Sequence, residues 1–191
     1  VAENEGKSTV AANLALSLAQ QGKRVLLIDA DMHKAAQYKL LGYNPRVELA
    51  DVLSGKAEYR PEYLEKHGLY VLLSKQGSRQ AAEQIAAERM GTLLEQARAE
   101  MDFVIIDSPP IALFSDVEYL ADRADASLLV VRQDCVPAPR INDAADLLRG
   151  CRSELLGCIL NDVRTTPFFS ESRRHGSGSG YGLGYGYGYG G

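Results

Sequence analysis

The chain has 191 residues, of which 46% are hydrophobic and 24% are charged, and its formal net charge is −4. This length and apolar content suit a single well-cored soluble domain, and the mild acidity gives no reason to expect nucleic-acid binding. The three cysteines have neither metal-ligand spacing nor the even number of a disulfide framework, so we expect reduced thiols and a cytoplasmic location. No apolar run approaches the ~20 residues that span a bilayer, and no signal peptide is visible.

The first residues indicate a phosphate-binding loop that leads into a helix. Residues 5–9 read Glu-Gly-Lys-Ser-Thr. In such a loop, small residues let backbone N–H groups converge on an anion, and the free N–H groups and dipole of the next helix add to them. Lys7 would reach the β- and γ-phosphates, and the Ser8 hydroxyl would hold Mg²⁺. Because so short a string is common, the interpretation depends on the rest of the chain.

A buried strand normally precedes a phosphate-binding loop of this kind. Here it would lie before Val1, and the sequence does not begin with Met. We therefore expect a fragment in which the first strand of the sheet is missing.

Apolar runs alternate with helical patterns through most of the chain. Residues 10–19 have helical spacing, with Gly22 as a plausible end, and residues 82–101 and 138–149 are further helical stretches. The predicted strands are residues 25–28, 69–73, 103–106, 127–131 and 156–160. This alternation predicts a mostly parallel α/β sheet with helices on both faces. Ligands bind at the carboxyl ends of such strands, where the sequence places Asp29, Asp31 and Asp107.

The composition changes at about residue 170. Residues 170–191 are rich in Gly, Ser and Tyr and have almost no aliphatic side chains, so we expect a disordered tail after a folded domain at residues 1–169. Four of the ten tyrosines lie there, and we interpret them as phosphate acceptors: Tyr181, Tyr185, Tyr187 and Tyr189. The alternative is a low-complexity tract without acceptors.

Taken together, these motifs resemble the cytoplasmic kinase domain of the bacterial tyrosine kinases of capsule and exopolysaccharide synthesis. The resemblance is carried by the loop at residues 5–9, a second Walker-type motif at 25–32, a Walker B string at 103–110 and the tyrosine-rich tail. Partitioning and division-site ATPases resemble the chain too, but they carry a lysine five residues before the loop lysine. Ala2 occupies that position here, which favours the kinases.

The resemblance implies a P-loop NTPase fold that binds ATP and Mg²⁺ and transfers phosphate to tyrosine. Asp29 would orient the tyrosine hydroxyl and accept its proton, because a phenol of pKa ~10 is protonated at pH 7. Asn161 would contact the adenine. The implied Mg²⁺ ligands are Ser8, Asp31 and Asp107, and the residues that cradle the phosphates are Asn4, Glu5, Gly6, Lys7, Ser8 and Thr9.

The resemblance also implies partners. Subunits of such kinases assemble in a ring and phosphorylate one another's tails in trans. A membrane activator of the polysaccharide co-polymerase type and a cognate tyrosine phosphatase are further expected partners, which would place the chain at the inner face of the plasma membrane. Two alternatives remain open at this point: a P-loop ATPase switch that binds partners without tyrosine transfer, and a nucleotide-binding scaffold without turnover.

Three departures from the family pattern affect catalytic efficiency more than ATP binding. Asn4 replaces a glycine before the loop, and Asn is the non-glycine residue that best tolerates positive φ. His33 replaces an arginine, which removes one fixed cation that Lys34 partly supplies. Residues 78–82 replace a proline-rich segment.

Overall fold

The computed structural model of the protein describes residues 1–75, 83, 85 and 88–164. The proposed tail at residues 170–191, its four tyrosines and most of the first turns of the helix expected from residue 82 lie outside the described residues. The domain boundary after residue 169 therefore stays a prediction.

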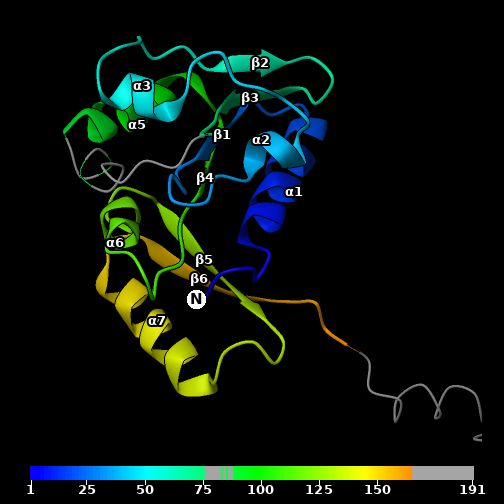
Figure 1. Ribbon diagram of the computed structural model, residues 1–191, viewed down its shortest axis with the longest axis vertical. Coiled ribbons are helices and arrows are strands. Elements are labelled where there is room, and N and C mark those ends of the chain that lie inside the picture. The colour runs from blue at the N-terminus through cyan, green and yellow to red at the C-terminus, as the bar shows by residue number, and fades with distance from the viewer. Residues whose placement is uncertain (76–82, 84, 86–87, 165–191) are drawn as a thin grey trace, which may run out of the picture.

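The described part alternates helices and strands along the chain, as Figure 1 shows. The helices are α1 (Lys7–Gln20), α2 (Gln37–Leu40), α3 (Leu49–Leu53), α5 (Glu88–Glu100), α6 (Asp116–Ala121) and α7 (Ala138–Gly150). The strands are β1 (Val25–Asp29), β2 (Glu62–Leu64), β3 (Leu69–Leu72), β4 (Phe103–Asp107), β5 (Ala126–Arg132) and β6 (Glu154–Asn161). All five predicted strands are present within two residues at each end.

The strands form two hydrogen-bonded sheets, one with the order β2-β3-β1-β4 and one that pairs β5 with β6. β1 runs parallel to both β3 and β4, and its register places Asp29 beside Asp107. β5 and β6 are also parallel, and among the described strands β2 alone is antiparallel to its neighbour. The mostly parallel α/β fold is therefore confirmed.

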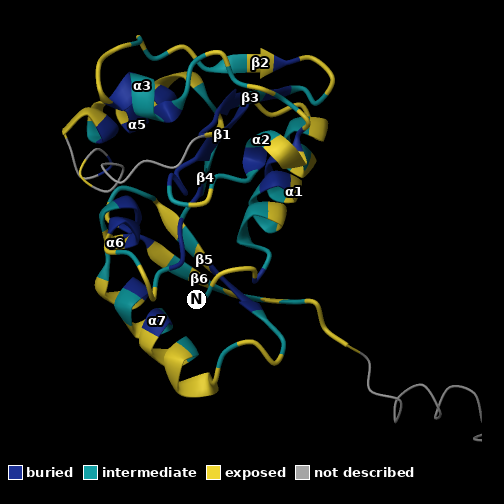
Figure 2. Ribbon diagram, in the orientation of Figure 1, coloured by how far each residue is buried: buried dark blue, intermediate teal, exposed yellow. Residues whose placement is uncertain are grey.

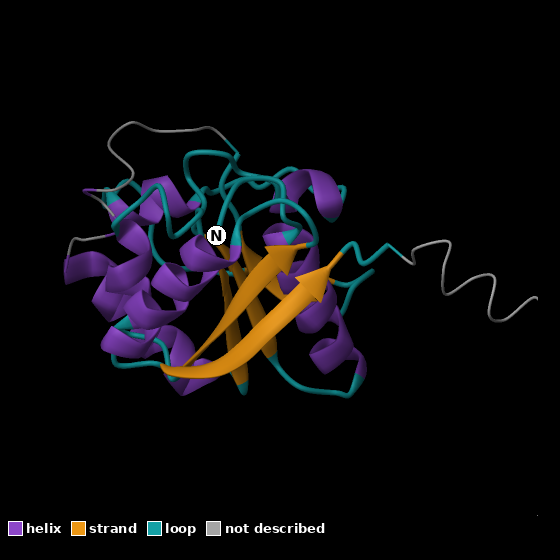
Figure 3. Ribbon diagram, turned by 90° about the horizontal axis from the view of Figure 1, so that it is seen from below, coloured by secondary structure: helices purple, strands orange, loops and turns teal. Residues whose placement is uncertain are grey.

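Helices cover both faces of the larger sheet, as expected for strands that are apolar along their whole length (Figure 3). Alternate residues of β1 face opposite layers. Leu27 packs in the cluster that contains Ala15 of α1, whereas Leu26 packs in the cluster that contains Leu93 of α5. Figure 2 shows β1 as buried along its length. This rigid centre fixes the carboxyl end of β1, where Asp29 lies.

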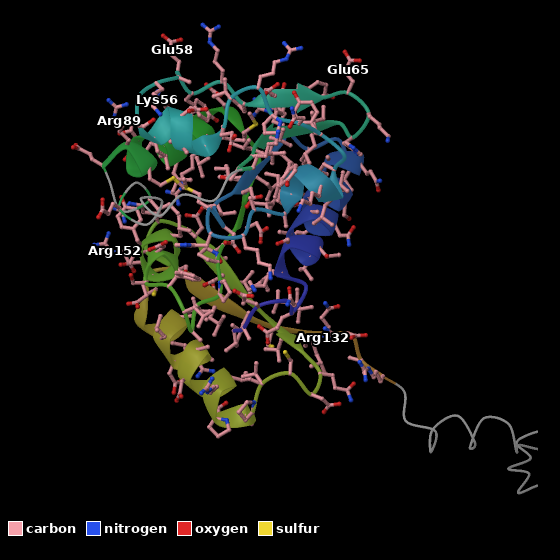
Figure 4. The ribbon with its side chains drawn as sticks, in the orientation of Figure 1. Lys56, Glu58, Glu65, Arg89, Arg132 and Arg152 are labelled. Atoms are coloured by element: carbon pink, nitrogen blue, oxygen red, sulfur yellow. The ribbon has the colours of Figure 1, made fainter. Side chains whose placement is uncertain are left out.

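A third core joins the smaller sheet to α7. It contains Leu129 and Val131 of β5, Leu148 of α7 and the side chain of Val1. The first residues of the chain therefore lie against β5, as the N marker in Figure 1 shows. At the carboxyl end of β5, Arg132 forms an ion pair with Asp162 at 2.6 Å, close to the last described residues (Figure 4).

Candidate active site

The phosphate-binding loop is a left-handed turn that ends at the first residue of α1. Gly6 has φ 88° and Asn4 has φ 60°, so the prediction that Asn4 holds a positive-φ position is confirmed. A side chain at Gly6 would collide with Asn161, because a Cβ there would lie 2.1 Å from Asn161 Nδ2. The first bond of α1 joins Val10 N to Gly6 O, and no side chain in the described part of the protein caps the helix. The N–H groups of its first turn are therefore available to an anion.

Two lysines lie at this loop. Lys7 Nζ donates a hydrogen bond to the carbonyl oxygen of Ala2 at 2.7 Å. Lys34, from the segment after β1, donates to Glu3 Oε2 and to Asn4 Oδ1, both at 3.1 Å. Lys34 therefore adds a second positive charge next to the phosphate-binding loop.

Asp29 lies at the carboxyl end of β1 and is fully buried. Its Oδ2 accepts hydrogen bonds from the backbone N–H groups of Ala36 and Gln37, whereas Oδ1 is buried with no partner among the described residues. Burial, reinforced by the negative charge of Asp107, raises the pKa of Asp29 to about 8. A buried acceptor without a donor is costly, so this carboxyl group fits a site that a ligand completes.

Asp107 ends β4 beside Asp29, and Ser8 and Gln37 contact it. The Ser8 hydroxyl donates to its carboxylate, and Gln37 Nε2 donates to Asp107 Oδ2 and to the Ser8 carbonyl, both at 2.8 Å. Burial raises the pKa of Asp107, and these two hydrogen bonds oppose the rise. Asp31 is also buried, and its negative charge helps to raise the pKa of Asp107. Asp31 Oδ1 accepts a hydrogen bond from the backbone N–H of Lys34 at 2.9 Å.

The other residues predicted to bind the nucleotide are Glu5, Thr9 and Asn161, and two of them form hydrogen bonds that the sequence did not indicate. Asn161 Nδ2 donates to the carbonyl oxygen of Glu5 at 2.9 Å, so the end of β6 holds the loop. The buried Glu5 carboxylate accepts from the amino group of Val1 and from the N–H of Ala2. Thr9 lies exposed in the first turn of α1. The expected contact between Asn161 and adenine stays a prediction.

Sequence reasoning missed Gln37 and the surroundings of His33. Gln37 is fully buried and links α1, β1 and β4, yet no motif marks it. His33 Nε2 lies 3.2 Å from Oδ2 of the buried Asp116, and its ring stacks on Phe114 with centroids 3.8 Å apart. The segment after β1 is thereby tied to the start of α6.

The site therefore brings together Ser8, Asp29, Asp31 and Asp107 from three elements. No group of three or more His, Cys, Asp or Glu side chains within residues 1–75, 83, 85 and 88–164 is arranged to hold a metal ion. Mg²⁺ uses one or two carboxylates and completes its shell with water and phosphate oxygens. A hydroxyl and two carboxylates beside a phosphate-binding loop suit that donor set.

Comparison with known proteins assigns the family. The chain matches the AAA domain family over residues 4–135. Tyrosine-protein kinase YwqD of Bacillus subtilis is 40% identical over 160 residues, which cover 82% of this chain and 67% of YwqD. The chain belongs to the bacterial tyrosine-protein kinase family. The succinoglycan biosynthesis transport protein ExoP of Rhizobium meliloti is 34% identical over 83% of this chain, and the chain spans only 21% of ExoP.

Solved structures agree with this assignment. The kinase domain of the Escherichia coli tyrosine kinase ETK has a TM-score of 0.81 and 29% identity, with 96% of this chain and 69% of the ETK chain covered. The division protein MinD of Pyrococcus horikoshii, solved with Mg-ADP, has a TM-score of 0.73 over 89% of this chain and 72% of its own. At 21% identity it shows the fold alone. The predicted membership of the polysaccharide-type tyrosine kinases is thus confirmed over the ATPase alternative. Among the described residues, no helix is long and apolar enough to cross a membrane.

Proposed function

We propose that this chain is an ATP- and Mg²⁺-dependent protein-tyrosine kinase domain that phosphorylates its own C-terminal tyrosines in the control of polysaccharide synthesis and export. The observation that carries the proposal is the position of the buried Asp29. It lies beside Asp107 at the carboxyl ends of paired strands, and Gln37 connects this pair to the first turn of α1. Phosphoryl transfer requires that the negative charge of the phosphates is neutralised and that the acceptor is positioned at the same site.

The residues at the loop fit a nucleotide and its cation. The uncapped first turn of α1 and Lys7 would hold the phosphates, with Lys34 close to the same loop. Ser8, Asp31 and Asp107 would hold Mg²⁺ directly or through water. When bound, the cation neutralises phosphate charge and lowers the pKa of nearby carboxyl groups.

Asp29 would act as the base. The tyrosine oxygen attacks the γ-phosphorus, the bond from this phosphorus to the β–γ bridging oxygen breaks, and the phenol proton passes to Asp29. A base must be ionised, and the pKa of about 8 in the ligand-free site leaves most of this carboxyl protonated at pH 7. A positive charge at the site, such as that of a bound cation, would lower the pKa of Asp29 and leave its carboxyl group ionised.

The acceptors would be Tyr181, Tyr185, Tyr187 and Tyr189. A Gly/Ser-rich tail of about 20 residues has a root-mean-square span of roughly 25 Å, which is enough to reach the site of a neighbouring subunit. Each phosphate adds about −1.5 to −2 charge, so a phosphorylated tail is repelled by a site lined with carboxylates. In this scheme subunits in a ring would phosphorylate one another's tails, phosphorylated tails would be released, and a tyrosine phosphatase would reverse the modification.

A membrane protein of the polysaccharide co-polymerase type would activate the domain and hold it at the inner face of the plasma membrane. The name of the relative ExoP, a succinoglycan biosynthesis transport protein, supports a link to polysaccharide transport.

The experiment compares three variants for phosphotyrosine after incubation with Mg²⁺/ATP and the activator. Lys7→Met and Asp29→Ala remove the phosphate ligand and the base, and we expect each to lose tail phosphotyrosine by at least 100-fold. Asp102→Ala is the matched control, because Asp102 pairs with Arg24 at the opposite, amino end of β4. Wild-type labelling by Lys7→Met or Asp29→Ala would show that the site is misassigned.

A further inference from the structure

Gln37 is the first residue of α2, and the packing of this helix fixes its position. Tyr38 of α2 and Leu41, which follows the helix, pack in the cluster that contains Ala15 of α1 and Leu27 of β1. Figure 1 shows α2 beside α1. Gln37 itself is fully buried. Packing of this kind holds a side chain in a defined place, so its hydrogen bonds also have defined partners.

The side-chain amide of Gln37 donates to both Ser8 and Asp107. Its Nε2 donates to the carbonyl oxygen of Ser8 and to Oδ2 of Asp107, both at 2.8 Å. Because a carbonyl oxygen can only accept, this pair of bonds also decides which end of the amide faces the site. Both hydrogens of Nε2 are therefore used on two residues that lie beside the phosphate-binding loop.

The other end of the same amide has no partner. Oε1 of Gln37 is buried and accepts no hydrogen bond from the described residues. An unpaired buried oxygen costs stability, and a residue that served the fold alone would have both ends of its amide satisfied. Gln37 instead satisfies the end that faces Ser8 and Asp107. Exceptions of this kind are expected where function, rather than stability, determines the residue.

The backbone of Gln37 holds a third group of the site. Its N–H donates to Oδ2 of Asp29 at 3.0 Å. The N–H at the start of a helix has no partner within the helix, so this bond takes nothing away from α2. With its amide at Ser8 and Asp107 and its backbone at Asp29, one residue fixes the positions of these three groups relative to one another.

We propose that Gln37 is a positioning residue for the Mg²⁺ of the nucleotide, and that it acts through Ser8 and Asp107 without contacting the cation. This inference rests on the proposed function, in which Ser8, Asp31 and Asp107 hold the cation. The hydrogen bond at Oδ2 restricts rotation of the Asp107 carboxylate, and the bond to the Ser8 carbonyl fixes the first turn of α1. Removing a residue that orients metal ligands in this way typically lowers metal affinity about 10- to 100-fold.

The test measures ADP binding to the full chain by titration calorimetry, in a series of Mg²⁺ concentrations and in a chelator. Gln37→Met keeps an unbranched side chain and the backbone N–H to Asp29 but has no amide. We expect the Mg²⁺ concentration that half-maximally enhances ADP affinity to rise about tenfold or more, with little change in the chelator. Gln37→Asn shortens the amide by one methylene group and should shift this concentration in the same direction, even if Gln37→Met does not fold. Gln21→Met is the matched control, because the Gln21 amide bonds to Ser17 at the exposed far end of α1.

Two outcomes overturn this inference alone. Folded Gln37 variants with the Mg²⁺ requirement of the wild type mean that the amide does not position the cation's ligands. An equal loss of ADP affinity with Mg²⁺ and with chelator means that Gln37 only supports the fold. Failure of the proposed function would differ from both, because ADP would then bind the wild-type chain equally well with and without Mg²⁺, which overturns the two proposals together. None of these readouts depends on kinase activity.

Discussion

At the scale of single residues, Gly6 is set by two separate constraints, its left-handed backbone and the closeness of Asn161. We predict that Gly6→Ala lowers the free energy of unfolding by more than the ~1–2 kcal/mol of left-handed strain, and that it weakens Mg-ADP binding. Gly22→Ala is the control, because Gly22 has φ 78° with nothing within 4 Å of an added Cβ. Titration calorimetry and chemical denaturation measure both effects. Equal losses for the two variants would mean that the contact with Asn161 has no cost.

Asp29 makes the stability of the metal-free protein depend on pH. Its pKa is about 8 in the folded state and ~3.9 when unfolded, so its contribution to stability is full below pH 4 and is lost as pH rises through about 8. We predict that the free energy of unfolding, measured with a chelator present, falls between pH 5 and 8. The limiting slope is ~1.4 kcal/mol per pH unit for one group.

Asp29→Asn should make the free energy of unfolding less dependent on pH between pH 5 and 8. Part of the dependence should remain, because the pKa of Asp107 is also raised. Asp102→Asn serves as the control, because pairing with Arg24 lowers the pKa of Asp102 and places its effect below pH 4. If Asp29→Asn leaves the slope between pH 5 and 8 unchanged, the buried carboxyl is not protonated on folding.

At the scale of elements, Gln37 holds α1, β1 and β4 in one arrangement. Gln37→Ala leaves the buried Asp107 without an amide donor, so we predict a loss of about 1–3 kcal/mol in the free energy of unfolding. The control is Gln21→Ala, which removes an exposed hydrogen bond to Ser17 and should change the free energy of unfolding by less than ~0.5 kcal/mol. Thermal and chemical unfolding of the two variants measure the difference. Similar values for both would mean that this buried link contributes no stability.

The elements also show which parts of the fold the sequence could predict. Continuous apolar runs identified β1 and β4 to within one residue, because strands buried on both faces need such runs. β2 was missed, since only Leu64 of its three residues is buried and its pairing is antiparallel at the edge. The short α2, α3 and α6 carry too few turns for a helical period to emerge.

The candidate site was predictable where a motif carries the chemistry. The positions of Lys7, Asp29 and Asp107 could be predicted from the sequence, because a loop before a helix and carboxylates after strands have fixed places in such folds. Their catalytic roles stay a prediction. Gln37 and the pair of His33 with Asp116 could not, since their contacts join segments distant in sequence. Long-range contacts of single polar side chains leave no periodic signal.

At the scale of the whole molecule, the phosphate-binding loop lies where two sheets converge. The larger sheet supplies Asp29 and Asp107, and the smaller sheet supplies Asn161, which holds the loop through Glu5. A shift of one sheet relative to the other would therefore move the loop relative to the carboxylates.

The central claim is that phosphate passes from ATP to the tyrosines of the tail. Mass spectrometry of residues 170–191, after the full chain is incubated with Mg²⁺/ATP and its membrane activator, tests it most directly. We predict phosphate on one or more of Tyr181, Tyr185, Tyr187 and Tyr189, and its absence in Lys7→Met. Formation of ADP with all four tyrosines unmodified would contradict the account and identify the chain as an ATPase switch.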